Sequence, residues 1–180
     1  MLVDQGSLFI AAGICAAALA VAMLSVWLHN RADHFFASGV LGLLLLGGGV
    51  ILYSSMPHEL TASTTAAFTM EIVGFIAVLV ASRQFAGRKT GWKKVAAIGL
   101  LVVPPVTIPL ALGLDGLGIM LYNFLATGLL AATAMEYWRM RAEALSSIAA
   151  MTVLYVLAAI SFFACGTILL HEANWVLAGR

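Results

Sequence analysis

The chain has 180 residues and a mass of 18.9 kDa; 63% of the residues are hydrophobic, only 9% are charged, and the formal net charge is +1. A typical soluble domain has about 45–50% apolar and about 25% charged residues, so too few charges remain here to cover a surface that faces water. This composition excludes a soluble enzyme, a disordered chain and a nucleic-acid-binding protein, and it indicates a polytopic membrane protein.

Six apolar segments are long enough to cross a bilayer. A helix rises about 1.5 Å per residue, so about twenty apolar residues cross about 30 Å of hydrocarbon. The segments that meet this rule are residues 8–28, 35–54, 63–82, 95–114, 117–137 and 147–170. Strands of a membrane barrel would show about ten residues of alternating polarity instead. We therefore predict an all-α fold, a polytopic transmembrane six-helix bundle that forms one integral membrane domain over residues 1–180.

Small residues predict where these helices pack. In lipid, helices associate mainly through close van der Waals contact, which favours small side chains spaced four residues apart. The first span has Gly13 and Ala17, and the fifth has Gly128 and Ala132. The second span has Gly39, Gly42 and the run Gly47-Gly48-Gly49. We interpret these positions as packing contacts.

The third span contains a carboxyl group, Glu71, near its middle. A charged carboxylate at that depth costs about 2.5–3.5 kcal/mol on insertion scales, and such groups usually face the interior of the bundle. Glu71 is therefore a candidate for proton sensing, for cation binding or for recognition of a polar ligand. A satisfied structural hydrogen bond is the alternative.

The fourth span contains Pro104, Pro105 and Pro109. Each proline removes an amide donor and clashes with a preceding carbonyl group, so we expect this helix to kink or partly unwind. Carbonyl groups freed in this way need partners, and broken helices usually border protein or a cavity. The three prolines are therefore candidate ligand-binding or sensing residues, and a tolerated kink is the alternative.

The fifth span adds Tyr122 and Asn123 as candidate ligand-binding or sensing residues. We expect Asn123 to hydrogen-bond Glu71 or the carbonyl groups of residues 104–109, either as part of a site or as structural glue. Glu136, near the end of the same span, is expected to form a solvated ion pair with Arg139 or Arg83.

The basic residues predict the orientation of the chain. Lys and Arg on short loops stay in the cytoplasm. The loops after the first, third and fifth spans hold Arg31, Arg83, Arg88, Lys89, Lys93, Lys94, Arg139 and Arg141, whereas the opposite loops hold neither Lys nor Arg. We predict a multi-pass protein of the bacterial inner membrane, with the N-terminus outside and, after six spans, residue 180 outside as well.

No catalytic or metal-binding motif occurs in the sequence. The four histidines and two cysteines lack a specific ligand spacing, so we predict no metal site and no cofactor. Ser/His/Asp sets, phosphate-binding glycine loops and HExxH are absent. The chain is therefore predicted to be non-catalytic, and its expected partners are the lipid bilayer, a small molecule in the bundle and a second copy of the chain, with no nucleic acid.

From about residue 31 to residue 170 the order of features resembles a known family. The features are Arg31, Phe35-Phe36, Gly39, a Leu/Gly-rich span, Pro57, then Arg83, Phe85-Ala86-Gly87-Arg88, Trp92 and Tyr137-Trp138-Arg139. This order is similar to that of the N-terminal multi-helix membrane region of bacterial diguanylate cyclases with a C-terminal GGDEF domain, or of related sensor kinases.

The resemblance implies a sensory input domain that passes a signal through its last helix to a cytoplasmic enzyme, often in a dimer. The sequence has no GGDEF signature, so no catalytic residue carries over, and we expect the chain to be truncated before a seventh helix and the cyclase domain. Two other hypotheses stand beside this one: a small-solute or ion transporter or channel subunit, and a structural subunit of a membrane complex.

Overall fold

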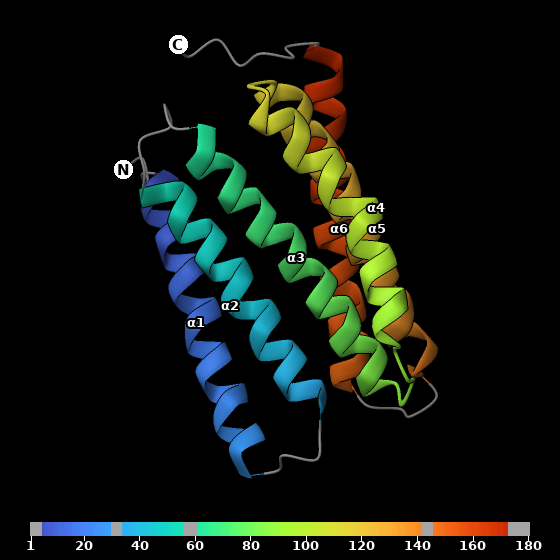
Figure 1. Cartoon of the computed structure of the whole chain (residues 1–180). Coiled ribbons are helices and arrows are strands. Elements are labelled where there is room, and N and C mark those ends of the chain that lie inside the picture. Colours follow the sequence, from blue (N-terminus) through green and yellow to red (C-terminus); the bar gives the residue numbers. More distant parts are fainter. Residues whose placement is uncertain (1–4, 30–33, 56–60, 142–145, 173–180) are drawn as a thin grey trace.

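The computed structural model describes residues 5–29, 34–55, 61–141 and 146–172, which contain six helices and no strand (Figure 1). The helices are α1 Gln5–His29, α2 His34–Ser55, α3 Thr61–Phe85, α4 Trp92–Ala111, α5 Asp115–Arg139 and α6 Ser146–Glu172. All of them are long and apolar enough to cross a membrane. The predicted all-α six-helix membrane bundle is confirmed.

The helix bounds agree with the predicted spans except at the end of α4. This helix was expected to reach residue 114, but it ends at Ala111 because Gly113 adopts a left-handed conformation with φ 76°. Gly113 N donates to Leu110 O at 3.0 Å and Leu114 N donates to Pro109 O at 2.9 Å, the two bonds of a Schellman motif. The glycine thus turns the chain directly into α5.

Of the kink or partial unwinding expected at Pro104, Pro105 and Pro109, the unwinding is wrong, and the kink stays a prediction. α4 is helical through all three prolines, from Trp92 to Ala111. A proline fixes φ near the helical value, and a membrane helix that loses amide donors is held in shape by its neighbours. The neighbours here are α3 and α5, which pack on the buried stripe Val102, Val106 and Leu110.

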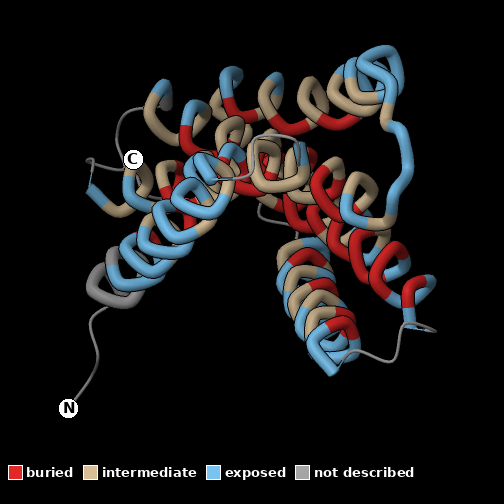
Figure 2. The backbone as a smooth tube through the Cα atoms, turned by 90° about the horizontal axis from the view of Figure 1, so that it is seen from below, coloured by how far each residue is buried: buried red, intermediate tan, exposed pale blue. Residues whose placement is uncertain are grey.

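α3 and α5 form the centre of the bundle. α1 packs on α2 and α2 on α3; α3 contacts both α4 and α5, and α5 contacts α4 and α6. The first three helices form one row and the last three lie beside it (Figure 1). α3 and α5 have the largest shares of buried residues and α1 and α6 the smallest. Figure 2 shows the buried positions along the inner faces of the helices and the exposed positions outside.

The outer surface of the bundle is apolar. Leu100, Leu101 and Leu112 are 77%, 72% and 71% exposed, and many other large hydrophobic side chains share the outer faces. An exposed apolar surface of this extent needs an apolar partner. In a chain whose helices all match the thickness of a bilayer, that partner is lipid.

Glycines let α2 approach both of its neighbours. A Cβ atom on Gly42 would lie 3.2 Å from Gly74 O, and one on Gly74 would lie 3.1 Å from Gly42 O, so the α2 and α3 backbones touch. Gly13 and Gly47 form the corresponding contact between α1 and α2. The predicted packing role of the α1 and α2 glycines is therefore confirmed.

Gly128 does not have the packing role that was predicted for it. A Cβ atom at this position would meet no atom of the described residues within 4 Å, whereas one at Gly118 of the same helix would lie 2.5 Å from Leu110 Cγ. Leu129, Leu130 and Ala126 are the buried residues of this part of α5. The four-residue spacing of Gly128 and Ala132 is therefore no sign of a close helix contact here.

Gly49 provides a test of the α2–α3 contact. A Cβ atom at Gly49 would lie 2.5 Å from Glu71 Cγ and 2.8 Å from Ala67 O. We expect Gly49→Ala to lower the free energy of unfolding by about 1–3 kcal/mol, because the new methyl group overpacks this interface. Thermal unfolding in detergent micelles measures the change. Gly128→Ala is the matched control, and equal melting temperatures for the two variants would contradict the close contact.

Candidate functional site

The structure brings two of the predicted site residues, Glu71 and Tyr122, together between the central helices. The Tyr122 hydroxyl group of α5 donates a hydrogen bond to Glu71 Oε2 of α3. Glu71 follows Ala67 and Phe68 on the buried face of α3, and Tyr122 is only 4% exposed. The carboxyl group thus has a polar partner on the neighbouring helix, as a polar group in hydrocarbon requires.

Aromatic rings surround this polar pair. The Tyr122 ring centroid lies 4.8 Å from that of Phe68, 6.4 Å from that of Phe75 and 5.8 Å from that of Phe162. Phe68 in turn contacts Tyr53 of α2 edge to face, at 5.4 Å. Helices α2, α3, α5 and α6 therefore all contribute a ring. Edge-to-face packing of this kind holds the tyrosine in one orientation and keeps its hydroxyl group directed at Glu71.

Asn123 does not make the expected contact with Glu71 or with residues 104–109. Its Nδ2 donates to Ile119 O, one turn earlier in α5, at 2.8 Å. Adjacent residues on a helix point about 100° apart, so the tyrosine at 122 can face α3 only if Asn123 faces elsewhere. Asn123 is buried, and its Nδ2 has its partner within its own helix.

Pro104, Pro105 and Pro109 lie on α4, partly buried beside the stripe that packs on α3 and α5. None of the cavities described below is lined by them. Their role in binding a ligand stays a prediction.

A second polar cluster lies at the ends of α3 and α5, and the sequence showed only part of it. Glu136 was expected to be solvated, but it is 6% exposed. Its carboxylate lies 3.6 Å from Arg83 Nε, 3.2 Å from an Arg88 terminal nitrogen and 3.4 Å from an Arg139 terminal nitrogen. The two expected partners of Glu136, Arg139 and Arg83, are confirmed, and Arg88 is a third partner. The expected solvated state of Glu136 is wrong.

A turn after α3 carries Arg88 back toward Glu136. Gly87 has φ 68°, Gly87 N donates to Gln84 O at 3.0 Å and Arg88 N donates to Arg83 O at 2.9 Å. This is a Schellman motif with glycine at its left-handed position. A glycine just after the last apolar residues of the third span was the signal in the sequence that could have placed Arg88 beside Arg83.

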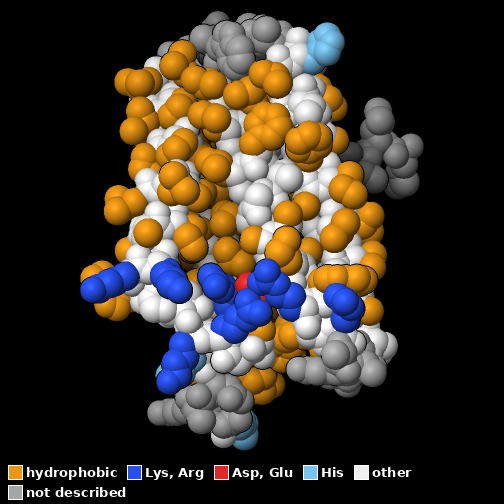
Figure 3. Space-filling model, turned by 90° about the vertical axis from the view of Figure 1, so that its right-hand side faces the viewer, with side chains coloured by type: hydrophobic (Ala, Val, Ile, Leu, Met, Phe, Trp, Pro, Cys, Tyr) orange, Lys and Arg blue, Asp and Glu red, His pale blue; other side chains and the backbone are white. Residues whose placement is uncertain are grey.

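Basic side chains form a belt across one face near this end of the bundle. Figure 3 shows most of the Lys and Arg side chains on this face in one band, with a small acidic surface among them. Trp92 and Trp138 are 75% and 55% exposed near the same end, and Arg141 stacks on the Trp138 ring at 4.6 Å. Exposed tryptophan beside basic residues is typical of the level of the lipid headgroups.

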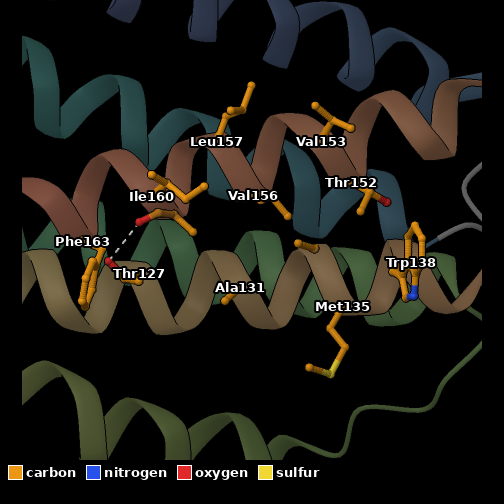
Figure 4. A pocket seen from close by; sticks show the side chains of 12 residues that line it. Thr127, Ala131, Met135, Trp138, Thr152, Val153, Val156, Leu157, Ile160 and Phe163 are labelled. Atoms are coloured by element: carbon orange, nitrogen blue, oxygen red, sulfur yellow. Dashed lines mark hydrogen bonds between the residues drawn. The ribbon is translucent and has the colours of Figure 1, made fainter.

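Two apolar cavities lie away from the polar groups. One, of about 700 Å³, is a groove between α5 and α6 (Figure 4) that runs from Phe163 past Thr127 to Trp138. The other, of about 280 Å³, lies between the two rows of helices, where Met23 and Leu43 face Tyr137 and Tyr155. Neither of these two cavities is lined by Glu71 or Tyr122.

Comparison with known proteins adds no family: no family model, curated protein or solved structure matches this chain.

The bond between Tyr122 and Glu71 should be measurable as an interaction between helices. We expect Tyr122→Phe to destabilise the protein by about 0.6–2 kcal/mol, the range of hydrogen bonds between membrane helices, because it removes the donor and keeps the ring. Glu71→Gln and the double variant complete a cycle that isolates the pair. Chemical or thermal unfolding in micelles measures each free energy. Additive effects of the two substitutions would show that the pair contributes nothing.

Proposed function

We propose that this chain is a membrane-embedded sensory input domain of a bacterial signalling receptor. One observation carries the proposal: α3 and α5 are joined at two depths. Tyr122 and Glu71 connect them inside the membrane, and Glu136 with Arg83 and Arg88 connects them at the basic end. A change at the inner contact is therefore transmitted along two rigid helices to the outer one.

The polar pair supplies a chemical event that such a sensor can detect. A carboxyl group holds or releases a proton, and Tyr122 competes with any polar ligand for its oxygen atoms. Loss of this bond removes one constraint on the relative position of α3 and α5. Helix shifts of about 1–2 Å are a common form of signal in packed bundles. The arginine cluster around Glu136 would then change at the basic end.

The resemblance to membrane regions of diguanylate cyclases and sensor kinases supports the same proposal. In such a receptor the chain lies in the bacterial inner membrane, is paired as a homodimer, and passes its signal through a further helix to a cytoplasmic output domain. The basic belt supports an orientation with this end in the cytoplasm, which leaves both termini outside.

Proton-coupled transport of a small solute or ion is the second candidate function. The observation that favours it is the same partly buried carboxyl group, since intramembrane acidic residues often belong to proton relays. The two candidates differ in what Glu71 does: in a transporter it exchanges a proton during flux, and in a sensor it changes the position of helices.

Spin labels separate the two candidates. Cysteines placed at the exposed residues Lys89 and Arg141, in a chain whose free Cys15 and Cys165 are replaced by serine, report the distance between the ends of α3 and α5. We expect Glu71→Gln to change this distance by about 1–2 Å in lipid nanodiscs. Double electron–electron resonance measures the distance between the two spin labels.

Thr127→Val is the matched control for this measurement. It also removes a polar group from the bundle, but within the described part of the chain the Thr127 hydroxyl group bonds to two backbone carbonyls, Asn123 O of α5 and Ala159 O of α6. An unchanged distance in Glu71→Gln, together with proton or solute flux in vesicles that this variant abolishes, would overturn the sensory proposal in favour of transport.

The orientation gives a separate prediction. Alkaline phosphatase fused after residue 180 should be active in bacterial cells, because it folds only outside the cytoplasm. The same enzyme inserted after Lys89 should be inactive, since the basic belt holds that turn inside. The reverse pattern of activities would show that the chain has the opposite orientation.

A further inference from the structure

A polar pocket of about 390 Å³ opens beside the basic belt, where the start of α2 meets the turn between α3 and α4. Its main lining residues are His34 and Phe35 of α2, Gln84 of α3, and Arg88, Lys89 and Thr90 of the turn. The two other cavities are apolar, so this pocket differs from them in chemistry as well as in place. Its volume is in the range of small-molecule sites.

We propose that this pocket binds the phosphate group of an anionic ligand, either a phospholipid headgroup or a soluble phosphorylated molecule. Arg88 and Lys89 supply positive charge and charge-assisted hydrogen bonds. The described residues that line the pocket include no Asp or Glu. The site stands on these residues alone and does not depend on the sensory function proposed above.

The neutral lining residues present hydrogen-bond donors. Gln84 accepts a bond from the Ser38 hydroxyl group through Oε1 at 2.9 Å, which leaves its amide NH₂ group as the free donor. Thr90 Oγ1 is buried and has no hydrogen-bond partner within the described part of the chain. Buried hydroxyl groups are nearly always paired, and an oxygen atom of a bound phosphate would satisfy this one.

Arg88 keeps donors for such a ligand although it pairs with Glu136. One of its terminal nitrogens lies 3.2 Å from the Glu136 carboxylate, and a guanidinium group has five N–H donors in all. Glu136 is shared by three arginines, so the cluster has a surplus of positive charge. This surplus faces the level of the lipid headgroups, where basic pockets between helices bind anionic lipids.

Isothermal titration calorimetry of the protein in a zwitterionic detergent tests the proposal. The three titrants are dioctanoyl phosphatidylglycerol, dioctanoyl phosphatidylcholine and inorganic phosphate. We expect phosphatidylglycerol or phosphate to bind and phosphatidylcholine not to bind. If phosphatidylglycerol binds and phosphate does not, the ligand is a lipid headgroup. If phosphate binds and competes with phosphatidylglycerol, the phosphate group alone is sufficient, and the pocket can also bind a soluble phosphorylated molecule.

Two charge-matched variants show whether the pocket is the site. Lys89→Glu reverses a charge in the lining, and Lys94→Glu reverses one on the exposed first turn of α4, outside it. We expect the affinity to fall about tenfold more in Lys89→Glu, because only Lys89 contacts the ligand directly. Arg88→Gln should weaken binding as well. Equal losses in the two lysine variants, or equal binding of the two lipids without phosphate binding, would overturn the proposal.

Discussion

The hydrogen bond between Tyr122 and Glu71 depends on how closely the surrounding helices pack. Water is absent from the hydrocarbon layer, so a carboxyl group there needs a partner from the protein. Gly49 allows α2 to lie directly against Glu71, and the rings of Phe68, Phe75 and Phe162 hold Tyr122 in place. The polar contact and the tight packing around it therefore form one structural unit at the centre of the bundle.

The same two helices meet again at the basic end, under different physical conditions. Around Glu136 the partners are three arginines at the headgroup level, and the carboxylate itself is buried among them, so salt screens these ion pairs less than it would screen exposed ones. In the membrane the contact between Tyr122 and Glu71 is a hydrogen bond between two helices, in a layer where water offers little competition. The same pair of helices thus has a hydrogen bond inside the membrane and an ion-pair cluster at the basic end, the arrangement on which the proposed sensory function rests.

Much of the fold was predictable because a bilayer restricts the alternatives. Only helices satisfy every backbone group of a single crossing segment, so the lengths of the apolar runs predicted the six helices to within a few residues. The residues at which helices end were harder to predict, because Gly113 ends α4 before its apolar run is complete. The unwinding predicted from the prolines was wrong for a related reason. Packing on α3 and α5 keeps α4 helical where an isolated helix would break.

Composition and the order of residues alone determined that the chain crosses a membrane and that the described part contains six helices. They also determined which end of the bundle is basic and that Glu71 is the polar group most in need of a partner. Only the tertiary structure decided that the partner is Tyr122 and not its neighbour Asn123, that Glu136 is buried among three arginines, and that Gly128 has no close neighbour among the residues that the structure describes. The reason is physical: hydropathy depends on the residues of one segment, whereas each of these contacts depends on the rotation of one helix about its axis relative to another.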